Sequence, residues 1–497
     1  MPLLTDILSQ VLPLSRYLGQ LLAATPALRD ELSAGWDQAL TAGEIRGFLP
    51  ATLDEETLKP ALRHLKQRAY VRVVTRDLAG LASLAEVTLS MTLIAEIAIE
   101  TALATLTAAL TARYGMPRNK LGEAQQLLVI GMGKLGGREL NASSDIDLIF
   151  VYPEDGETDA AGANARPLGN FDFFTRLGRG LINAISEITG DGQVFRVDMR
   201  LRPNGDSGPL VCNFDMLENY FIAQGREWER YAWIKARALG ETCSGDANTD
   251  AHRYFRGKHW SKWNATLESI RRPFIFRKYL DFGAIDAMRA LHAQIRHEVA
   301  RKDMTGNVKL GPGGIREIEF IAQVFQLIRG GRDTQLQIKP TLQVLALLAE
   351  RQQISLDAAL ELAAAYNFLR RLEHRLQYLD DAQTHSLPDN PADQAIIARS
   401  MGFISYAALL VELDDHRAAV AAHFAAVFAD SNRASHALDG LWQSRDGDTQ
   451  VDELLRQGYR DAATVARRLA AMRAGGRYQQ MPEPVRERFD AVVPRII

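Results

Sequence analysis

The spacing of apolar and polar residues predicts helices on both sides of one block of short strands. Residues 1–115 are rich in leucine and alanine, poor in glycine and helical in period. Because alanine and leucine are the strongest helix formers, this segment is predicted to be an N-terminal helical domain. Its most apolar part, 81–112, is interrupted by glutamates and has no run of about 18 uncharged residues, so we predict a buried helix pair rather than a membrane span.

The pattern changes after residue 115. Residues 116–240 hold short β-rich runs and one helical segment, 171–188, and are predicted to form a mixed α and β domain. The predicted strands are 127–130, 147–152, 194–201 and 209–214. The polar and aromatic stretch 241–265 is expected to be a loop or insertion.

Helical periodicity returns after residue 265. The loop 311–314 precedes a helix predicted for 315–328, and a leucine stripe predicts another for 357–379. Residues 266–435 are therefore expected to form a helical bundle, and 436–497 the start of a helical linker or regulatory region. The fold class predicted is α+β, mostly helical, and we expect the chain to be one half of a longer polypeptide.

Composition narrows the class of protein without identifying its chemistry. The 497 residues are 47% hydrophobic and 24% charged with a net charge of −3, typical of a soluble globular protein and no reason to expect nucleic-acid binding. Cys212 and Cys243 can make neither a disulfide framework nor a four-ligand zinc site. The N-terminus lacks a basic region and carries Asp6 early, so it is a poor signal peptide. We expect a cytoplasmic protein without nucleic-acid or membrane partners.

Two aspartates follow a glycine turn inside the strand block. Asp145 and Asp147 lie two residues apart at the start of a predicted strand, so both carboxylates can face one cleft. Asp198, among apolar residues of another predicted strand, is the candidate third acid, because a carboxylate there needs a partner or a metal. Mg²⁺ prefers carboxylate oxygens and substrate phosphates, and two metals can hold the attacking and leaving oxygens of a displacement at phosphorus. The three aspartates therefore predict a nucleotidyl-transfer site.

The glycines before these aspartates also fit a dinucleotide-binding fingerprint, which the spacing excludes. Gly131, Gly133 and Gly136 follow a strand in the order G-x-G-x-x-G. Only residues 137–144 separate them from the aspartates, whereas a full βαβ crossover takes at least about 10–12 residues. A Walker A loop is excluded as well, because Leu135 follows the lysine where serine or threonine is required.

Several charged residues are candidates for lining the site, each with a structural alternative. Arg200 and Arg202 lie at steps of two from Asp198, so in a regular strand they share its face and can bind phosphate, or they merely neutralise the aspartates. Lys235 and Arg237 can contact nucleotide or form structural salt bridges.

Near a predicted helix start, Glu317 and Glu319 can line the site, or they can serve as a helix cap with a pair between Arg316 and Glu319. His374 and Arg375 are expected on a solvated helix face and His385 in a loop. The aromatic residues of the segment 226–237 are expected in the core or at an interface, namely Trp228, Tyr231 and Trp233.

Five long motifs resemble one known family. They are GMGKLGGRELNASSDIDLIFVY, RVDMRLRPNGDSGPLV, GREWERYAWIKAR, KLGPGGIREIEFIAQVFQLIRGG and FLRRLEHRLQ with QTHSLP. In this order they resemble the bifunctional glutamine synthetase adenylyltransferase/adenylyl-removing enzyme, and the likeness runs from the N-terminus into 436–497. The resemblance implies a nucleotidyltransferase (DNA polymerase β-like) mixed-sheet domain flanked by helical domains. The single aspartate block and the wording ELNASSDIDLIF resemble the first, adenylyl-removing half.

That resemblance implies a reaction and its partners. Inorganic phosphate attacks the adenylyl-tyrosine of glutamine synthetase and releases ADP, while the other half of the family's proteins adds AMP from ATP. Asp145, Asp147 and Asp198 are then the Mg²⁺ ligands and catalytic residues. The PII signalling protein and glutamine are the implied effectors. The nucleotide- or phosphate-binding residues expected beside the arginines are Lys134, Gly136, Gly137 and Ser144.

Two alternatives stay open. One is an adenylyl-adding enzyme of the same fold, which needs the same three aspartates. The other is a non-catalytic regulatory module that docks on glutamine synthetase or PII. The stretch 241–265 is longer than the family pattern predicts, so the resemblance does not extend to the structure of a surface loop in this stretch.

Overall fold

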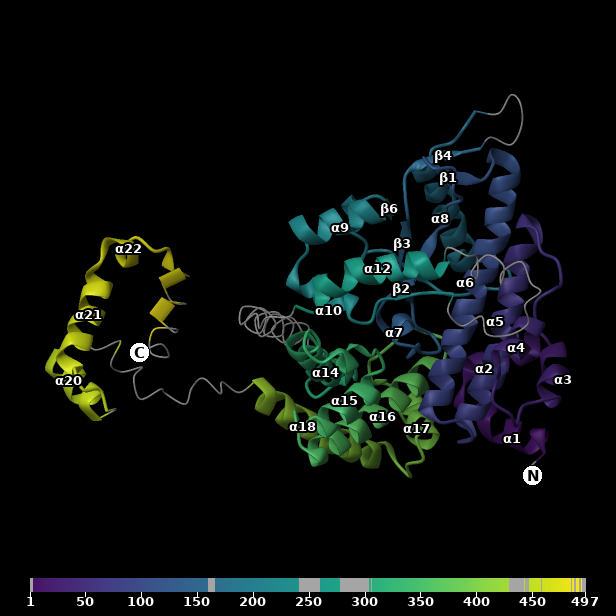
Figure 1. Ribbon diagram of the computed structural model, residues 1–497. Coiled ribbons are helices and arrows are strands. Elements are labelled where there is room, and N and C mark those ends of the chain that lie inside the picture. The colour runs from purple at the N-terminus through teal and green to yellow at the C-terminus, as the bar shows by residue number, and fades with distance from the viewer. Residues whose placement is uncertain are drawn as a thin grey trace. The chain divides into compact units, whose positions relative to one another are not determined.

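The computed structural model divides the chain into two compact units, Met1–Phe424 and Ala425–Ile497 (Figure 1). It describes residues 3–159, 166–240, 260–277, 304, 306–428, 442, 447–456, 458–483, 485–486, 489–490 and 493. The first unit is mostly helical and contains a small mixed sheet, as predicted for an α+β protein. The finer division into five segments stays a prediction.

The N-terminal part of the first unit is helical. Polar caps define where the long helices begin, since the Asp54 and Ser83 side chains accept hydrogen bonds from Thr57 and Glu86 amides. The elements are α1 (Leu4–Val11), η1 (Leu12–Leu14), α2 (Arg16–Ala24), α3 (Ala27–Ser33), α4 (Ala42–Gly47), α5 (Glu55–Leu78) and α6 (Leu84–Tyr114).

The predicted helix pair in 81–112 is wrong, because α6 is one continuous helix. No glycine or proline interrupts Leu84–Tyr114, and the helix ends at Gly115, whose φ of 88° a side chain would disfavour. By length and composition α6 could cross a membrane. Its central residues, such as Ile94, Ile97 and Leu103, are instead buried in the protein core.

Within the described residues, five strands form one mixed sheet in which β3 is central. Strand β2 is antiparallel to both β3 and β7, whereas β5 and β6 are both parallel to β3. A separate antiparallel pair joins β1 and β4. The strands are β1 (Pro117–Asn119), β2 (Leu128–Gly131), β3 (Ile146–Tyr152), β4 (Gly156–Thr158), β5 (Val197–Asp198), β6 (Val211–Asn213) and β7 (Arg237–Ala238).

The strand predicted for 194–201 is much shorter than expected. Strand β5 ends at Asp198, whose carboxylate accepts a hydrogen bond from the backbone amide of Arg200 at 2.8 Å. This contact turns the chain away from the sheet, since an aspartate that binds the amide two residues on replaces a ladder hydrogen bond. The predicted strand 209–214 is likewise reduced to β6.

The sheet and the N-terminal helices share one hydrophobic core. It joins residues such as Leu103 of α6, Phe150 of β3 and Phe173 of α8. Helix α8 matches the predicted helix 171–188 closely. The elements around the sheet are α7 (Gly133–Gly136), α8 (Asn170–Ser186), η2 (Gly205–Ser207), α9 (Phe214–Ala223), α10 (Glu227–Trp233) and α12 (Trp260–Ile275).

Part of the loop expected at 241–265 is helical. Residues 241–259 lie outside the described residues, but α12 begins at Trp260. Trp263, Leu267 and Ile270 recur at helical spacing and are buried, which explains why this part is a helix.

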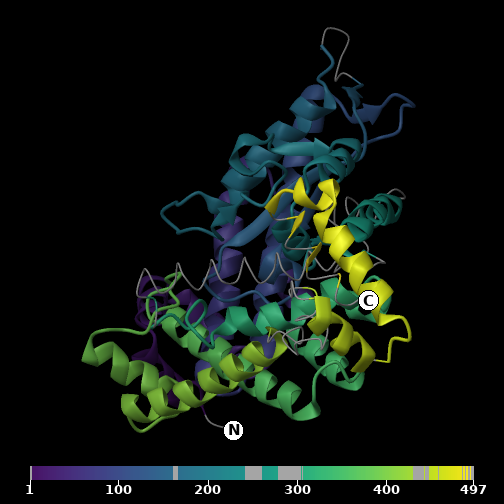
Figure 2. The same cartoon turned by 90° about the vertical axis from the view of Figure 1, so that its left-hand side faces the viewer.

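The remaining helices of the first unit gather at one end of the sheet (Figures 1 and 2). The helices predicted for 315–328 and 357–379 are confirmed to within one residue at either end. The elements are α14 (Ile315–Arg329), η3 (Thr334–Gln337), α15 (Thr341–Glu350), α16 (Leu356–Tyr378), α17 (Pro391–Ser400) and α18 (Tyr406–Phe428), the last of which reaches the unit boundary.

The second unit has a small core of its own. Leu454, Ala466 and Leu469 are buried around Trp442, whose ring nitrogen donates to Asp490 at 2.9 Å. Its described helices are α20 (Gly447–Arg456), α21 (Ala462–Ala474) and α22 (Gly476–Gln479).

Candidate functional site

The parallel pairing of β3 and β5 brings two of the predicted site acids side by side. In the register of these strands Asp147 is the direct partner of Asp198, and Ile146 of Val197. Asp145 immediately precedes β3, two residues from Asp147. Acids 51 positions apart in the sequence therefore meet at one edge of the sheet, although their predicted roles stay predictions.

Asp147 carries an electrostatic signature of this crowding. Burial raises its pKa to about 7, with further contributions from the negative charges of Asp145 and Asp198. Lys309 and Arg200 act in the opposite direction. A carboxyl group that is this hard to ionise marks a place where a positive ligand is favoured.

The donor chemistry of these acids suits Mg²⁺, but they do not form a ready metal cluster. Among the residues that the structure describes, no group of three or more His, Cys, Asp or Glu side chains is placed to hold a metal ion. Asp198 is also engaged elsewhere, because Arg200 Nε donates to its carboxylate at 2.8 Å. For Asp198 to reach a metal shared with Asp147, this arginine has to release it.

The glycine turn lies directly beside Asp147. Gly133 has φ +50°, and a Cβ there would sit 3.2 Å from a carboxylate oxygen of Asp147. The one-turn helix α7 links antiparallel strands, which rules out the parallel βαβ unit of a dinucleotide-binding fold. Gly136 has a structural reason to be glycine, because a Cβ would lie 2.0 Å from the Lys235 carbonyl oxygen.

The other residues predicted to bind nucleotide or phosphate near this turn are Lys134, Gly137 and Ser144, and each has different surroundings. Lys134 Nζ donates to both carboxylate oxygens of Glu373 at 2.9 Å, so its charge is already paired. A Cβ at Gly137 would lie 3.1 Å from a carboxylate oxygen of Glu139. Ser144 is half-buried directly before Asp145.

The expectation that Arg200 and Arg202 share a strand face with Asp198 is wrong, because the strand has ended. Arg200 is largely exposed and forms a salt bridge with Asp198, which is the neutralising alternative. Arg202 folds into the following turn, where its guanidinium donates to the Met199 carbonyl oxygen at 2.8 Å.

Lys235 and Arg237 form buried structural ion pairs. Lys235 Nζ donates to Glu139 at 2.7 Å and lies 3.4 Å from Glu319. Arg237 pairs with Glu96 of α6 and also donates to the Gly136 carbonyl oxygen at 3.1 Å. Both residues thus tie the glycine turn to its surroundings, as the salt-bridge alternative predicted.

The acids at the start of α14 have distinct surroundings. Glu317 accepts a hydrogen bond from the Gly313 amide at 3.1 Å, as a helix-start acid does. Glu319 lies 3.4 Å from Lys235 Nζ, and although burial acts to raise its pKa, the charges of Lys235 and Lys134 lower it.

The prediction of a solvated charged face on α16 is wrong. Arg370, Glu373 and His374 are fully buried, and Arg375 is 2% exposed. This face packs on the segment 139–143 and on the end of α5, while the leucine stripe packs within the bundle.

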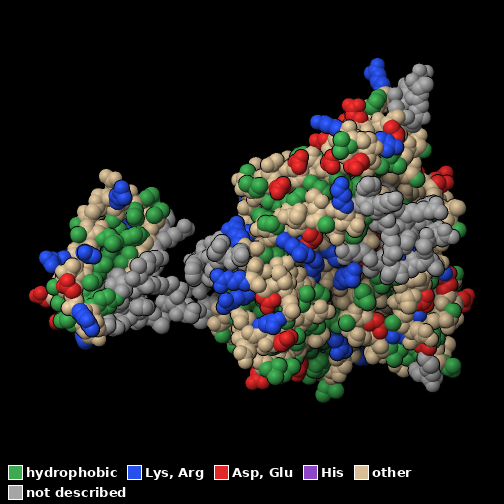
Figure 3. Space-filling view, in the orientation of Figure 1, with side chains coloured by type: hydrophobic (Ala, Val, Ile, Leu, Met, Phe, Trp, Pro, Cys, Tyr) green, Lys and Arg blue, Asp and Glu red, His purple; other side chains and the backbone are tan. Residues whose placement is uncertain are grey.

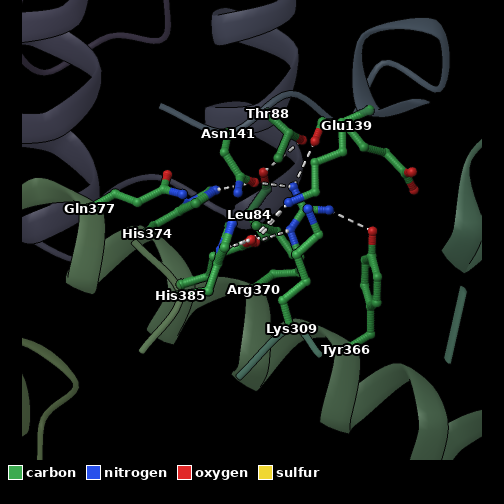
Figure 4. A network of polar contacts seen from close by, with 12 residues as sticks. Leu84, Thr88, Glu139, Asn141, Lys309, Tyr366, Arg370, His374, Gln377 and His385 are labelled. Carbon is green, nitrogen blue, oxygen red and sulfur yellow. Dashed lines mark hydrogen bonds and ion pairs between the residues drawn. The ribbon is translucent and has the colours of Figure 1, made fainter. Parts of the chain in front are cut away.

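Figure 4 shows the hydrogen bonds and ion pairs made by buried polar side chains of this face, such as Arg370 and His374. Arg370 donates to the Glu139 carbonyl oxygen at 2.6 Å, and His374 lies 3.2 Å from the side-chain oxygen of Asn141. Arg375 pairs with Asp77 at 2.7 Å. His385 does lie in a loop, as expected, and its ring contacts Glu373 at 2.9 Å.

The expectation of a core or interface position is confirmed for Trp233 and Tyr231. Trp233 is buried against Phe221, and Tyr231 packs on Phe320 of α14. Trp228 is 39% exposed and therefore not a core residue, so an interface position for it stays a prediction.

The sequence analysis did not predict two charged residues that interact with the glycine turn and the aspartates. Glu373 pairs with Lys134, and the Lys309 charge acts on Asp147. A signal existed for Glu373, because Arg370, Glu373 and Gln377 repeat at the same helical steps as the leucines, which indicates a helix buried on two faces. Lys309 has no signal of this kind, since it stands alone before a glycine-rich loop.

Comparisons with known proteins identify two family models that match the chain. Residues 5–252 match the family model described as glutamate-ammonia ligase adenylyltransferase, and residues 289–428 match that described as GlnD PII-uridylyltransferase. These two matches cover the sheet region and the helical bundle.

Curated relatives named bifunctional glutamine synthetase adenylyltransferase/adenylyl-removing enzyme are similar along nearly the whole chain. The protein of Aromatoleum aromaticum is 54% identical over 99% of this chain and 50% of its own length. The protein of Burkholderia mallei is 50% identical over 99% of this chain and 54% of its own length. The protein of Neisseria meningitidis serogroup A is 43% identical over 93% of this chain and 50% of its own length. The chain spans about half the length of the curated relatives it matches. With these matches along nearly its whole length, the chain belongs to the glutamine synthetase adenylyltransferase/adenylyl-removing enzyme family.

Proposed function

We propose that the sheet region is a nucleotidyltransferase domain of the DNA polymerase β-like type that removes AMP from an adenylyl-tyrosine of glutamine synthetase. The observation that supports it is the strand register that places Asp147 beside Asp198, with Asp145 two residues away. The resemblance of residues 139–150 to the first half of the family's proteins supports the removing direction.

The proposed reaction is a phosphorolysis. An oxygen of hydrogen phosphate forms a bond to the phosphorus of AMP, and the bond from that phosphorus to the tyrosine oxygen breaks. The phosphate's proton ends on the tyrosine hydroxyl, and ADP is released. Such transfers depend mainly on positioning and charge stabilisation, so no strong protein acid or base is required.

The residues of the chain then have separate tasks. Asp145, Asp147 and Asp198, once Arg200 has released it, would hold Mg²⁺, which supplies charge stabilisation at the attacking and leaving oxygens. Gly133 leaves space beside Asp147, where a side chain would crowd the carboxylate. Lys235 and Arg237 position the glycine turn through buried ion pairs.

The proposal extends to partners and place of action. Glutamine synthetase is the protein substrate, ATP/ADP and inorganic phosphate are the small reactants, and PII and glutamine are the effectors. Mg²⁺ is the cofactor and the cytoplasm the location.

The test is to incubate the purified chain with adenylylated glutamine synthetase, Mg²⁺ and phosphate, and to follow ADP. Phosphate-dependent ADP release is the expected result. AMP transfer from ATP onto unmodified glutamine synthetase, without ADP release from the adenylylated form, would reverse the direction. Neither activity in a folded protein would support a regulatory module instead.

A further inference from the structure

Lys309 is held in place by the backbone around it. The Asn307 side chain accepts hydrogen bonds from the amides of Lys309 and Leu310 at 3.0 and 2.8 Å. The amide of Val308 donates to the His385 carbonyl oxygen at 2.8 Å, and that of Ile315 to the Val308 carbonyl oxygen at 3.1 Å. The main chain that carries Lys309 is therefore fixed by its own loop, which favours a preorganised role for its side chain.

This loop is connected to the glycine turn by two short contacts. The ring of His385 lies 2.9 Å from Glu373, and Glu373 in turn accepts from Lys134 at 2.9 Å. Lys134 follows Gly133, the glycine beside Asp147. Figure 4 draws Lys309 in the same cluster as Arg370 and His385, and its charge lowers the pKa of Asp147. The segment that carries Lys309 is thus linked, through His385, Glu373 and Lys134, to the glycine turn beside Asp147.

Within the described residues, Lys309 differs from Lys134 and Lys235 in having no ion-pair partner within 4.0 Å, although its charge acts on Asp147 and Glu319. Lys134 is paired with Glu373 and Lys235 with Glu139. Within the described residues, the half-buried Lys309 ammonium forms no ion pair within 4.0 Å and no side-chain hydrogen bond. A partly desolvated charge without a close ion-pair partner favours the arrival of an anion.

The wider surface is consistent with an anionic ligand. Although the net charge is −3, lysine and arginine side chains gather in the middle of one face, over the region of α7, α10 and α14 (Figure 3). Acidic side chains on this face lie mostly towards its edges. Such a field attracts phosphate-bearing groups.

We propose that Lys309 binds a phosphate oxygen of the reacting groups and, with Arg200, supplies the positive charge on the protein side of the site. The inference rests on the proposed nucleotidyl-transfer function and names a residue for it outside the aspartate block. The oxyanion has two possible sources, the incoming inorganic phosphate and the phosphate of AMP.

The experiment compares Lys309→Met and Lys309→Arg with a control, Lys120→Met, at an exposed lysine in the turn after β1. Initial rates of ADP release are measured against phosphate and, separately, against the adenylylated protein. A KM for phosphate raised roughly 10-fold in K309M and restored in K309R assigns Lys309 to the incoming phosphate. A similar loss of kcat/KM for the adenylylated protein, with the KM for phosphate unchanged, assigns it to AMP. Constants within about twofold of wild type in K309M overturn the proposal.

A binding measurement separates failure of this proposal from failure of the proposed function. ADP and inorganic phosphate are titrated calorimetrically into wild type and each variant, with folding checked by circular dichroism. Weaker binding of either one by K309M, but not by K120M, supports the proposal even if no turnover is found. Equal binding of both by wild type and K309M refutes it, whatever the activity. Lys309→Gln replaces K309M if the methionine variant does not fold.

Discussion

Two charged regions of the first unit lie next to each other, and the pKa of a buried carboxyl group is raised in one and lowered in the other. At the sheet edge, three aspartates gather, and burial with like charges raises the pKa of Asp147 to about 7. On α16, burial also opposes ionisation of Glu373, but Lys134 and His385 hold its pKa well below the usual range. The first region has surplus negative charge, and the second is internally matched.

This difference distinguishes a ligand site from a structural network. Removing one partner of a buried ion pair strongly destabilises the fold, because the other charge is left buried and unpaired. A cluster of like charges weakens the fold locally and is satisfied by a cation from outside. The aspartates should therefore govern activity, and the α16 face should govern stability.

The largest effect is expected at the aspartates. Asp145→Asn or Asp147→Asn should reduce ADP release roughly 10³-fold, because charge stabilisation of the transferred group is lost. The melting temperature should not fall, since the change removes like-charge repulsion. The matched control is Asp172→Asn, at an exposed acid in the first turn of α8. Full activity in either site variant would contradict the proposed chemistry.

A loss of stability is expected on the matched side of the comparison. Asp77 is 4% exposed and receives Arg375 at 2.7 Å and the Tyr378 hydroxyl at 2.7 Å. Asp77→Asn should lower the free energy of unfolding by about 3–5 kcal/mol, because it leaves a buried guanidinium without its anion. Urea unfolding of both proteins at pH 7 measures this loss. A loss below about 1 kcal/mol would show that burying Arg375 without its anion costs little, which would contradict the prediction.

The pH dependence sharpens the same point. Burial alone would raise the pKa of Asp77, but Arg375 and His374 lower it well below the usual range. The folded pKa lies under the unfolded value of about 3.9, so the stabilisation is present above pH about 4 and is lost as the pH falls. The gap in unfolding free energy between wild type and Asp77→Asn should shrink by roughly 1 kcal/mol from pH 5 to pH 3. A constant gap over this range would contradict the assignment.

The smallest effect is expected for an exposed ion pair on the same helix. Glu361 of α16 is 56% exposed and accepts from His423 of α18 at 2.6 Å. Glu361→Gln should change the unfolding free energy by less than about 1 kcal/mol, since solvent screens such pairs. If urea unfolding gave a change as large as that of Asp77→Asn, burial would not be what separates the two pairs.

The local structure was largely readable from periodicity and turn chemistry. The helices at 315–328 and 357–379 and the strands around the aspartates follow from spacing within single segments. The short spacer between Gly136 and Asp145 also excluded the dinucleotide fold correctly. The failed expectations are those that depended on a second segment, such as the extent of β5 and the solvation of α16.

The sequence by itself determined the alternation of helical and β-rich blocks, and the two-residue step between Asp145 and Asp147. Only the tertiary structure decided that Asp147 pairs with Asp198, that Arg370 and Glu373 are buried, and that the Lys309 charge acts on Asp147. The physical reason is that periodicity reports which residues of one element share a face. What lies opposite that face comes from other parts of the chain, here as far away as the 239 residues between Lys134 and Glu373.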